Sequence, residues 1–119
     1  MYPPPPPDVI AKLVGRSIEL ISIGKYVAHL TFDNEDRISI ACPFRFDRSD
    51  SITDAPIQEF PLNSSTILRV IGTSIEHAKC QSDGTLEIRF DNGDGLIVYA
   101  NDPSYEAYTL LINRIEYVV

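Results

Sequence analysis

Two glutamates stand at matching places in two similar stretches of the chain, and a pair of carboxylates can do acid–base chemistry or bind a cation. Glu19 ends the stretch 8–19, which returns 57 residues later as the stretch 65–76, ending at Glu76. If the two stretches face each other across an axis, the two carboxylates would share one cleft. Glutamates beside turns are more often exposed, either paired with a neighbour such as Arg16 or turned outward by a β-bulge. Both interpretations of Glu19 and Glu76 stay open at this point.

The acidic segment 91–95, Asp-Asn-Gly-Asp-Gly, invites comparison with a calcium loop. Such a loop needs oxygen ligands at alternating positions, glycine at the sixth place and glutamate at the twelfth. Here apolar residues stand where the later ligands belong, and the matching segment 33–37 lacks both glycines. The segment therefore predicts a β-hairpin turn, and we expect neither a metal site nor a cofactor.

The remaining reactive side chains form no catalytic pattern. His29 and His77 stand at unmatched positions of the two stretches, and alternation places both on the outward face of a strand. Cys42 and Cys80 lack metal-type spacing and align with small or apolar residues, which predicts two buried free thiols. Since no nucleophile or phosphate-binding motif occurs, we expect no enzymatic activity.

Tyrosines and acids gather near the C-terminal end of the sequence. Exposed tyrosines beside carboxylates are typical of protein-binding surfaces, although they can also fill the rim of a sheet and bond locally. The segment 102–108 has no match earlier in the chain, and a part that differs between similar stretches is a good place for a specialised surface. The candidate binding residues are therefore Tyr99, Asp102, Tyr105, Glu106 and Tyr108.

The elements that position these residues repeat as well. Each stretch starts with one apolar helical turn, at 9–14 and 66–71, which Gly15 and Gly72 end. Alternating apolar residues then predict three strands in each copy, at 17–23, 27–32 and 38–42 and at 74–80, 85–90 and 96–100. The sequence predicts an α+β fold, mostly antiparallel β, with two tandem copies of a short helix plus a three-strand unit and pseudo-two-fold symmetry.

The chain length suits one domain, 8–119, preceded by a polyproline arm, 1–7. The copies cover about 8–46 and 65–119, with a connection at 47–64. The stretch Pro43–Pro61 predicts a long, partly irregular connection. At the C-terminal end, the segments 105–112 and 115–119 predict one or two further strands that turn at Asn113 and Arg114.

Composition limits the partners. The chain has a net charge of −7, and DNA or RNA binding needs clustered Lys and Arg, so we expect no nucleic acid partner. Apolar residues make up 44% of the sequence, but no apolar run is long enough to span a membrane. With no signal segment in view, we expect a cytoplasmic location.

The run Ile88–Val98, followed by Tyr-Glu-Ala-Tyr at 105–108, resembles a family of small, β-rich bacterial proteins of uncharacterised function. Some relatives of that family look like immunity proteins that neutralise toxins. The resemblance covers about the last third of the chain and transfers no catalytic residue.

These observations favour a non-catalytic protein-binding domain, of the immunity or antitoxin kind, whose acidic face covers a basic protein partner. One alternative is a homo-oligomeric structural or small-ligand-binding subunit, in which edge strands pair into a homodimer. Another is an enzyme or metal-dependent protein that uses Glu19 and Glu76.

Overall fold

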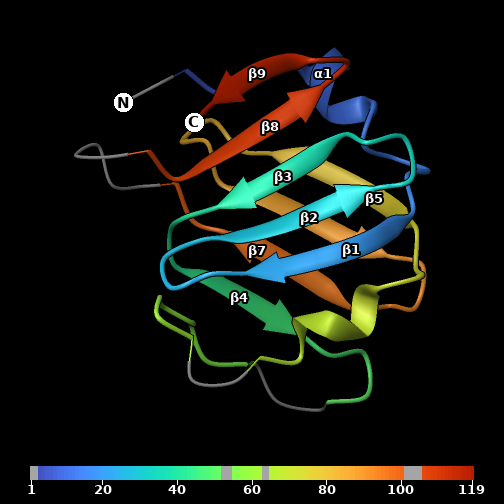
Figure 1. Cartoon of the computed structure of the whole chain (residues 1–119), viewed down its shortest axis with the longest axis vertical. Coiled ribbons are helices and arrows are strands. Elements are labelled where there is room, and N and C mark those ends of the chain that lie inside the picture. Colours follow the sequence, from blue (N-terminus) through green and yellow to red (C-terminus); the bar gives the residue numbers. More distant parts are fainter. Residues whose placement is uncertain (1–2, 52–54, 63–64, 101–105) are drawn as a thin grey trace.

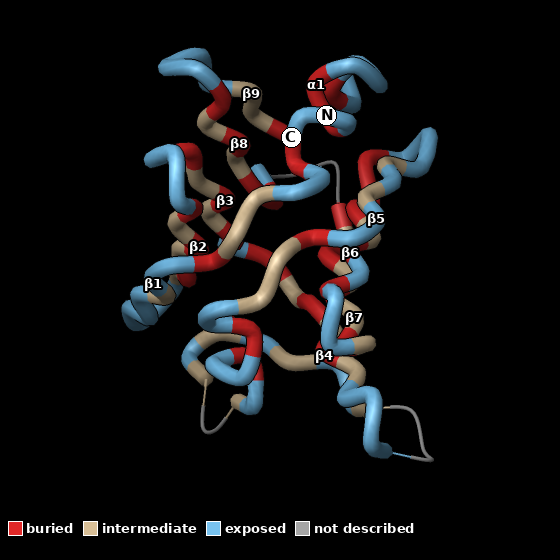
Figure 2. The backbone as a smooth tube through the Cα atoms, turned by 90° about the vertical axis from the view of Figure 1, so that its right-hand side faces the viewer, coloured by how far each residue is buried: buried red, intermediate tan, exposed pale blue. Residues whose placement is uncertain are grey.

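The structure is a computed structural model that describes residues 3–51, 55–62, 65–100 and 106–119. It is mostly antiparallel β-structure, as predicted; of the two short helices that we expected, one is an α-helix and the other is a 3₁₀ turn. Two sheets pack face to face, and the side chains between them form the core (Figures 1 and 2). Edge-on, the buried residues lie between the two layers (Figure 2).

The first sheet has the strand order β1-β2-β3-β8-β9 and the second has the order β4-β7-β6-β5. All neighbouring strands run antiparallel. The strands of the first sheet are β1 (Ile18–Ile23), β2 (Ala28–Phe32), β3 (Arg37–Ile40), β8 (Tyr108–Ile112) and β9 (Ile115–Val118). Those of the second are β4 (Phe44–Asp47), β5 (Ile75–Cys80), β6 (Leu86–Phe90) and β7 (Gly95–Val98).

Alternation in the sequence explains which residues reach the core. In β6 the residues Leu86, Ile88 and Phe90 are buried, while Glu87 is half-buried and Arg89 is exposed. The same alternation holds in β2, β3, β4, β7 and β8. Successive side chains of a strand point to opposite faces, so each sheet presents an apolar face to the other sheet and a polar face to water.

A helical turn precedes the first three strands of each half. The first is the α-helix α1 (Pro7–Ala11), which contacts β5, and the second is the 3₁₀ turn η1 (Ile67–Val70). Pro7, which we assigned to the polyproline arm, is the first residue of α1. Gly15 and Gly72 follow with φ of 88° and 87°, a conformation that glycine adopts without steric cost.

The fourth strand of each half pairs with the other half, which the sequence did not predict. β4 comes directly after β3 but pairs with β7, whereas β8 comes after β7 but pairs with β3. The expected irregular connection from Pro43 is therefore wrong for Phe44–Asp47, which is a regular strand. Further along, Gln58 forms an isolated antiparallel bridge with Phe44 through two backbone hydrogen bonds.

The C-terminal hairpin forms as predicted. β8 and β9 pair across a two-residue turn at Asn113 and Arg114, whose φ angles are 52° and 68°. Among the described residues, no helix has the length and apolar character needed to cross a bilayer.

Candidate functional site

The predicted tyrosine and acid surface is only partly within the described residues, since Asp102 and Tyr105 lie outside them. Tyr99 is half-buried just after β7, and its backbone N–H donates to the carbonyl of Pro43 at 3.1 Å. Glu106 is exposed. The described part of this segment therefore offers one exposed carboxylate and one partly exposed ring.

Tyr108 is a correction to the prediction, because it belongs to the core. Its side chain is only 1% exposed, and its hydroxyl donates a 2.7 Å hydrogen bond to the carbonyl of Gly84. Burial, together with the neighbouring thiol of Cys80, raises the pKa of Tyr108 above its ordinary value. A ring that fills the space between the sheets cannot take part in an exposed surface.

Cys80 itself is half-buried and so less enclosed than we expected, whereas Cys42 is buried as predicted.

Glu19 and Glu76 lie at β-bulges. The pairing of β1 with β2 skips Glu19, and the pairing of β5 with β6 skips Glu76. Each bulge shifts the register by one residue, so that the carboxylate turns to solvent although the alternation places it on the core side. Glu76 lies near His77, with 3.9 Å between Oε1 and Nε2. The bulge interpretation of these residues is therefore the one that the geometry supports.

The acidic turns are structural, as the hairpin prediction required. Asp94 is completely buried and Asp36 is 6% exposed. In each turn the asparagine two residues earlier, Asn92 or Asn34, donates its amide N–H to the aspartate at 3.0 or 2.9 Å. Each aspartate is thus held in place within its own hairpin.

Each buried aspartate also receives a backbone N–H from just beyond a fourth strand. Asp94 Oδ1 accepts from Ser49 at 2.8 Å, beyond β4, and Asp36 Oδ1 accepts from Asn113 at 3.1 Å, beyond β8. Asp94 additionally accepts from Nε of Arg69 at 3.1 Å. Burial alone would raise the pKa of Asp94, but the hydrogen bonds from Ser49 and Arg69 outweigh it and lower this pKa. Each turn therefore holds the end of a fourth strand, β4 or β8, against the sheet that this strand joins.

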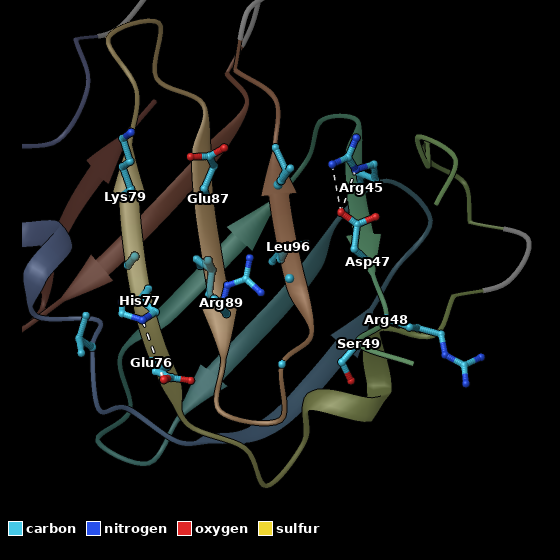
Figure 3. Close-up of a pocket in the computed structure, with 16 residues that line it drawn as sticks. Arg45, Asp47, Arg48, Ser49, Glu76, His77, Lys79, Glu87, Arg89 and Leu96 are labelled. Carbon is cyan, nitrogen blue, oxygen red and sulfur yellow. Dashed lines mark hydrogen bonds and ion pairs between the residues drawn. The ribbon is translucent and has the colours of Figure 1, made fainter. Parts of the chain in front are cut away.

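A broad hollow lies on the outer face of the second sheet (Figure 3). It has a volume of about 900 Å³, within the usual range for ligand sites. Strand register arranges its floor in two rows. The first row is Lys79, Glu87, Ile97 and Arg45, and the second is His77, Arg89, Gly95 and Asp47.

Charge collects in this hollow, which we call the charged hollow. Its lining includes four basic side chains and three acidic ones, a balance of +1 on a chain with a net charge of −7. Arg45 is paired with Asp47, with 3.0 Å between Nη2 and Oδ2. Arg48, at the rim, is paired with Asp50 at 2.7 Å. In the part of the chain that the structure describes, Lys79 and Arg89 have no ion pair.

The outer face of the first sheet is different in kind. The positions that correspond by register to the two rows are Ser22, His29, Ser39 and Thr109, and Leu20, Thr31, Arg37 and Leu111. Only one of these eight residues carries a permanent charge. His29 bonds to Ser39 at 2.7 Å between Nδ1 and Oγ, so the imidazole is engaged in a local contact rather than in a charged cluster.

Sequence reasoning missed the charged hollow, although a signal for it existed. The alternation in 85–90 already placed Glu87 and Arg89 outward, and the matching residues of the first copy are His29 and Thr31. Alternation within a strand could not show that β4 joins this sheet. β4 supplies Arg45 and Asp47 from the other half of the chain.

The family model described as "Family of unknown function (DUF6188)" matches residues 9–119. No curated protein matches the chain, and no solved structure matches it either. Within the described residues, no group of three or more His, Cys, Asp or Glu side chains is arranged to hold a metal ion.

Proposed function

This chain belongs to DUF6188, a family of unknown function, and we propose that it is a non-catalytic protein-binding domain. Its binding surface is the charged hollow on the outer face of the β4-β7-β6-β5 sheet. The resemblance to immunity-like proteins adds a narrower form of the proposal, in which the bound protein is inhibited. Neither form requires a catalytic residue.

The contrast between the two outer faces supports the proposal most directly. The inner faces of the two sheets are alike, because both supply apolar side chains to the core between the sheets. Outward, the corresponding positions of the first sheet carry one permanent charge, Arg37, while the other face gathers four of the ten Lys and Arg residues of the chain. Stability alone gives no reason for this difference, because exposed ion pairs contribute little to it. Charged complementarity at an interface does give one, since it directs association and selects partners.

The experiment compares captured proteins between two variants of equal net charge. In the first, Lys79→Ser and Arg89→Thr, the hollow receives the residues found at the corresponding positions of the first sheet. In the control, Lys12→Thr and Lys25→Ser, two exposed lysines outside the hollow are replaced. We expect quantitative mass spectrometry to find a protein that wild type and control retain and the hollow variant loses. The same set of proteins on all three baits would overturn the proposal.

We also propose that the two halves are copies of one unit around an approximate two-fold axis. Reciprocal contacts support this: Gly15 N–H donates to the Ile75 carbonyl and Gly72 N–H to the Ile18 carbonyl, both at 2.8 Å. The hydroxyls of the matching residues Ser17 and Ser74 meet at 2.9 Å.

A homo-oligomeric subunit is the second candidate, and one observation favours it. β1 is an edge strand whose outer side is bonded to Gly72 and Thr73 at Ile18. Beyond that point it exposes Leu20 and Ile23, which are 55% and 45% exposed. Free edges with apolar side chains can pair with a second copy. Light scattering of the purified chain tests this: a monomer at high concentration would rule it out, and Leu20→Lys should dissociate a dimer that forms through β1.

A further inference from the structure

The second row of the charged hollow contains a gap. Gly95 has no side chain, and it lies between Arg89 on β6 and Asp47 on β4. Strands are about 4.8 Å apart, so the Cα atoms of Arg89 and Asp47 are separated by roughly 10 Å, and Gly95 places no side chain between them. At the corresponding position the first sheet has Arg37, a large side chain. The gap is thus a property of this face and not of the fold.

Arg89 is the cation beside the gap. Its side chain is exposed and leans from β6 toward β7 (Figure 3). Among the described residues it makes no side-chain hydrogen bond or ion pair. Asp47, on the far side of the gap, is already engaged, since Arg45 contacts its Oδ2 through both Nε and Nη2 at 3.1 and 3.0 Å. A guanidinium with no carboxylate of its own is suited to bind one from outside with two parallel hydrogen bonds.

We propose that the charged hollow takes an acidic segment of a partner protein, with one carboxylate side chain seated over Gly95 against Arg89. The inference rests on the proposed protein-binding function and adds the class of partner. Lys79 and Arg45 lie at the two ends of the first row and attract further carboxylates of the same segment.

The acids within the hollow argue for a protein segment over a nucleic acid. Glu87 stands between Lys79 and Ile97 in the first row, Asp47 borders the gap beside Gly95, and Glu76 also lines the hollow. A phosphate backbone carries only negative charge and requires an excess of cations, which a balance of +1 on an acidic chain does not provide. A peptide can place its own N–H groups or basic side chains near these acids and its carboxylate at Arg89.

The first test uses defined probes and the ¹⁵N-labelled full chain. The main probe is a blocked peptide of alternating serine and glutamate, and the comparison probes are the same peptide with glutamine, inorganic phosphate and an oligothymidylate. A further peptide carries its only carboxylate at a free C-terminus. We expect the glutamate peptide to shift the amide signals of Arg89, Gly95 and Ile97, with Thr31 and Ser39 unmoved.

Equal shifts with the glutamine peptide, shifts on the first sheet, or stronger binding of phosphate or oligothymidylate would overturn the proposal. A stronger response to the C-terminal carboxylate would contradict the assignment to side chains.

The second test fills the gap. A β-carbon at Gly95 would meet only the Ile88 carbonyl, at 3.8 Å, and Gly95 does not have a positive φ, so a larger residue fits the fold. We expect Gly95→Thr to weaken glutamate-peptide binding at least about tenfold, or about 1.4 kcal/mol, while the thermal midpoint stays the same or rises. Arg89→Gln should weaken binding similarly, and the control Thr31→Val should leave it unchanged. Full binding by Gly95→Thr and Arg89→Gln would refute the proposal.

The two proposals fail in different ways. If the hollow variant loses a captured protein but no acidic peptide binds, the protein-binding function stands and the acidic class of partner is wrong. If the capture experiment finds no dependence on Lys79 and Arg89, the binding function itself falls.

Discussion

Asp94 shows how one residue can decide the stability of a turn and of a strand from another part of the chain. Its carboxylate has no contact with solvent, and its two oxygens accept from Ser49, Arg69 and Asn92. Such a buried charge is tolerated only because each oxygen is satisfied. Removing the charge leaves donors from two other segments without an acceptor.

Asp94→Asn should therefore lower the free energy of unfolding by about 2–3 kcal/mol. The amide keeps one acceptor oxygen, but its NH₂ group replaces the second oxygen and then faces other N–H donors. Because the folded pKa of Asp94 is lowered, its contribution is present above the ordinary value of 3.8 and is lost as pH falls through the folded pKa. Urea unfolding at neutral pH and near pH 3 measures both effects. Asp33→Asn, at an exposed turn position, is the control. An equal loss in both variants would contradict this account.

His29 gives a second pH-dependent prediction. Burial and the nearby charge of Arg37 lower the pKa of His29 below 6.5, so the unfolded chain binds this proton more readily than the folded one. Wild type should lose stability relative to His29→Gln as pH falls from about 7 to about 5. Thermal midpoints at several pH values measure it, with His77→Gln, at a side chain 73% exposed, as the control. Parallel curves for wild type and His29→Gln would rule out the effect.

At the scale of elements, the turn of the β8–β9 hairpin has a cost in conformational free energy, because two residues other than glycine adopt positive φ. A two-residue hairpin with positive φ at both positions matches the twist of the strands, and glycine is the residue that favours its second position. This chain has Arg114 there, with φ of 68°. The register nevertheless holds, because Ile112 pairs with Ile115 and the N–H of Asn113 is bound by Asp36.

Arg114→Gly should raise the free energy of unfolding by about 0.5–1 kcal/mol, since glycine adopts positive φ without the clash of a β-carbon. Arg114→Ala is the matched control, because it removes the same side chain but keeps that clash. Thermal unfolding compares the three proteins. A gain of the same size in both variants would show that the arginine side chain, and not its backbone conformation, sets the cost.

At the scale of the whole molecule, the exchange of β4 and β8 makes each half depend on the other. The second sheet takes its β4 edge from residues before position 64, and the first sheet takes β8 and β9 from the end of the chain. Each half alone would keep the pairing of its second and third strands, but it would leave the other side of the third strand unpaired and its fourth strand apart from the sheet that this strand joins.

We therefore expect fragments 1–63 and 64–119 to be unfolded when separate and to fold when mixed in equal amounts. Circular dichroism and thermal melts of each fragment and of the mixture provide the measurement. A cooperative transition in either fragment by itself would contradict the interdependence. The thermal midpoint of the uncut chain is the reference value for the mixture of fragments.

Much of the local structure was predictable because it follows from neighbouring residues. Alternation located the three strands of each half, a glycine with positive φ follows each helical turn, and Asn113 and Arg114 marked the last hairpin. The turns themselves end earlier than predicted, at Ala11 and Val70. The bulges at Glu19 and Glu76 were foreseen as one alternative, since a carboxylate on the core side must otherwise be paired. Tyr108 was misplaced because a tyrosine between acids looks exposed, and nothing local shows that Gly84 accepts its hydroxyl.

By itself, the sequence determined the period of each strand, the positions of the turns and which face of each sheet is apolar, because these depend on spacing along the chain. The tertiary structure alone decided which strands become neighbours. Strands pair through backbone hydrogen bonds, which any two strands can form whatever their side chains are. That choice set β4 beside β7, and it brought Arg45 and Asp47 to the face that already carried Lys79 and Arg89. The charged hollow exists only after that pairing is made.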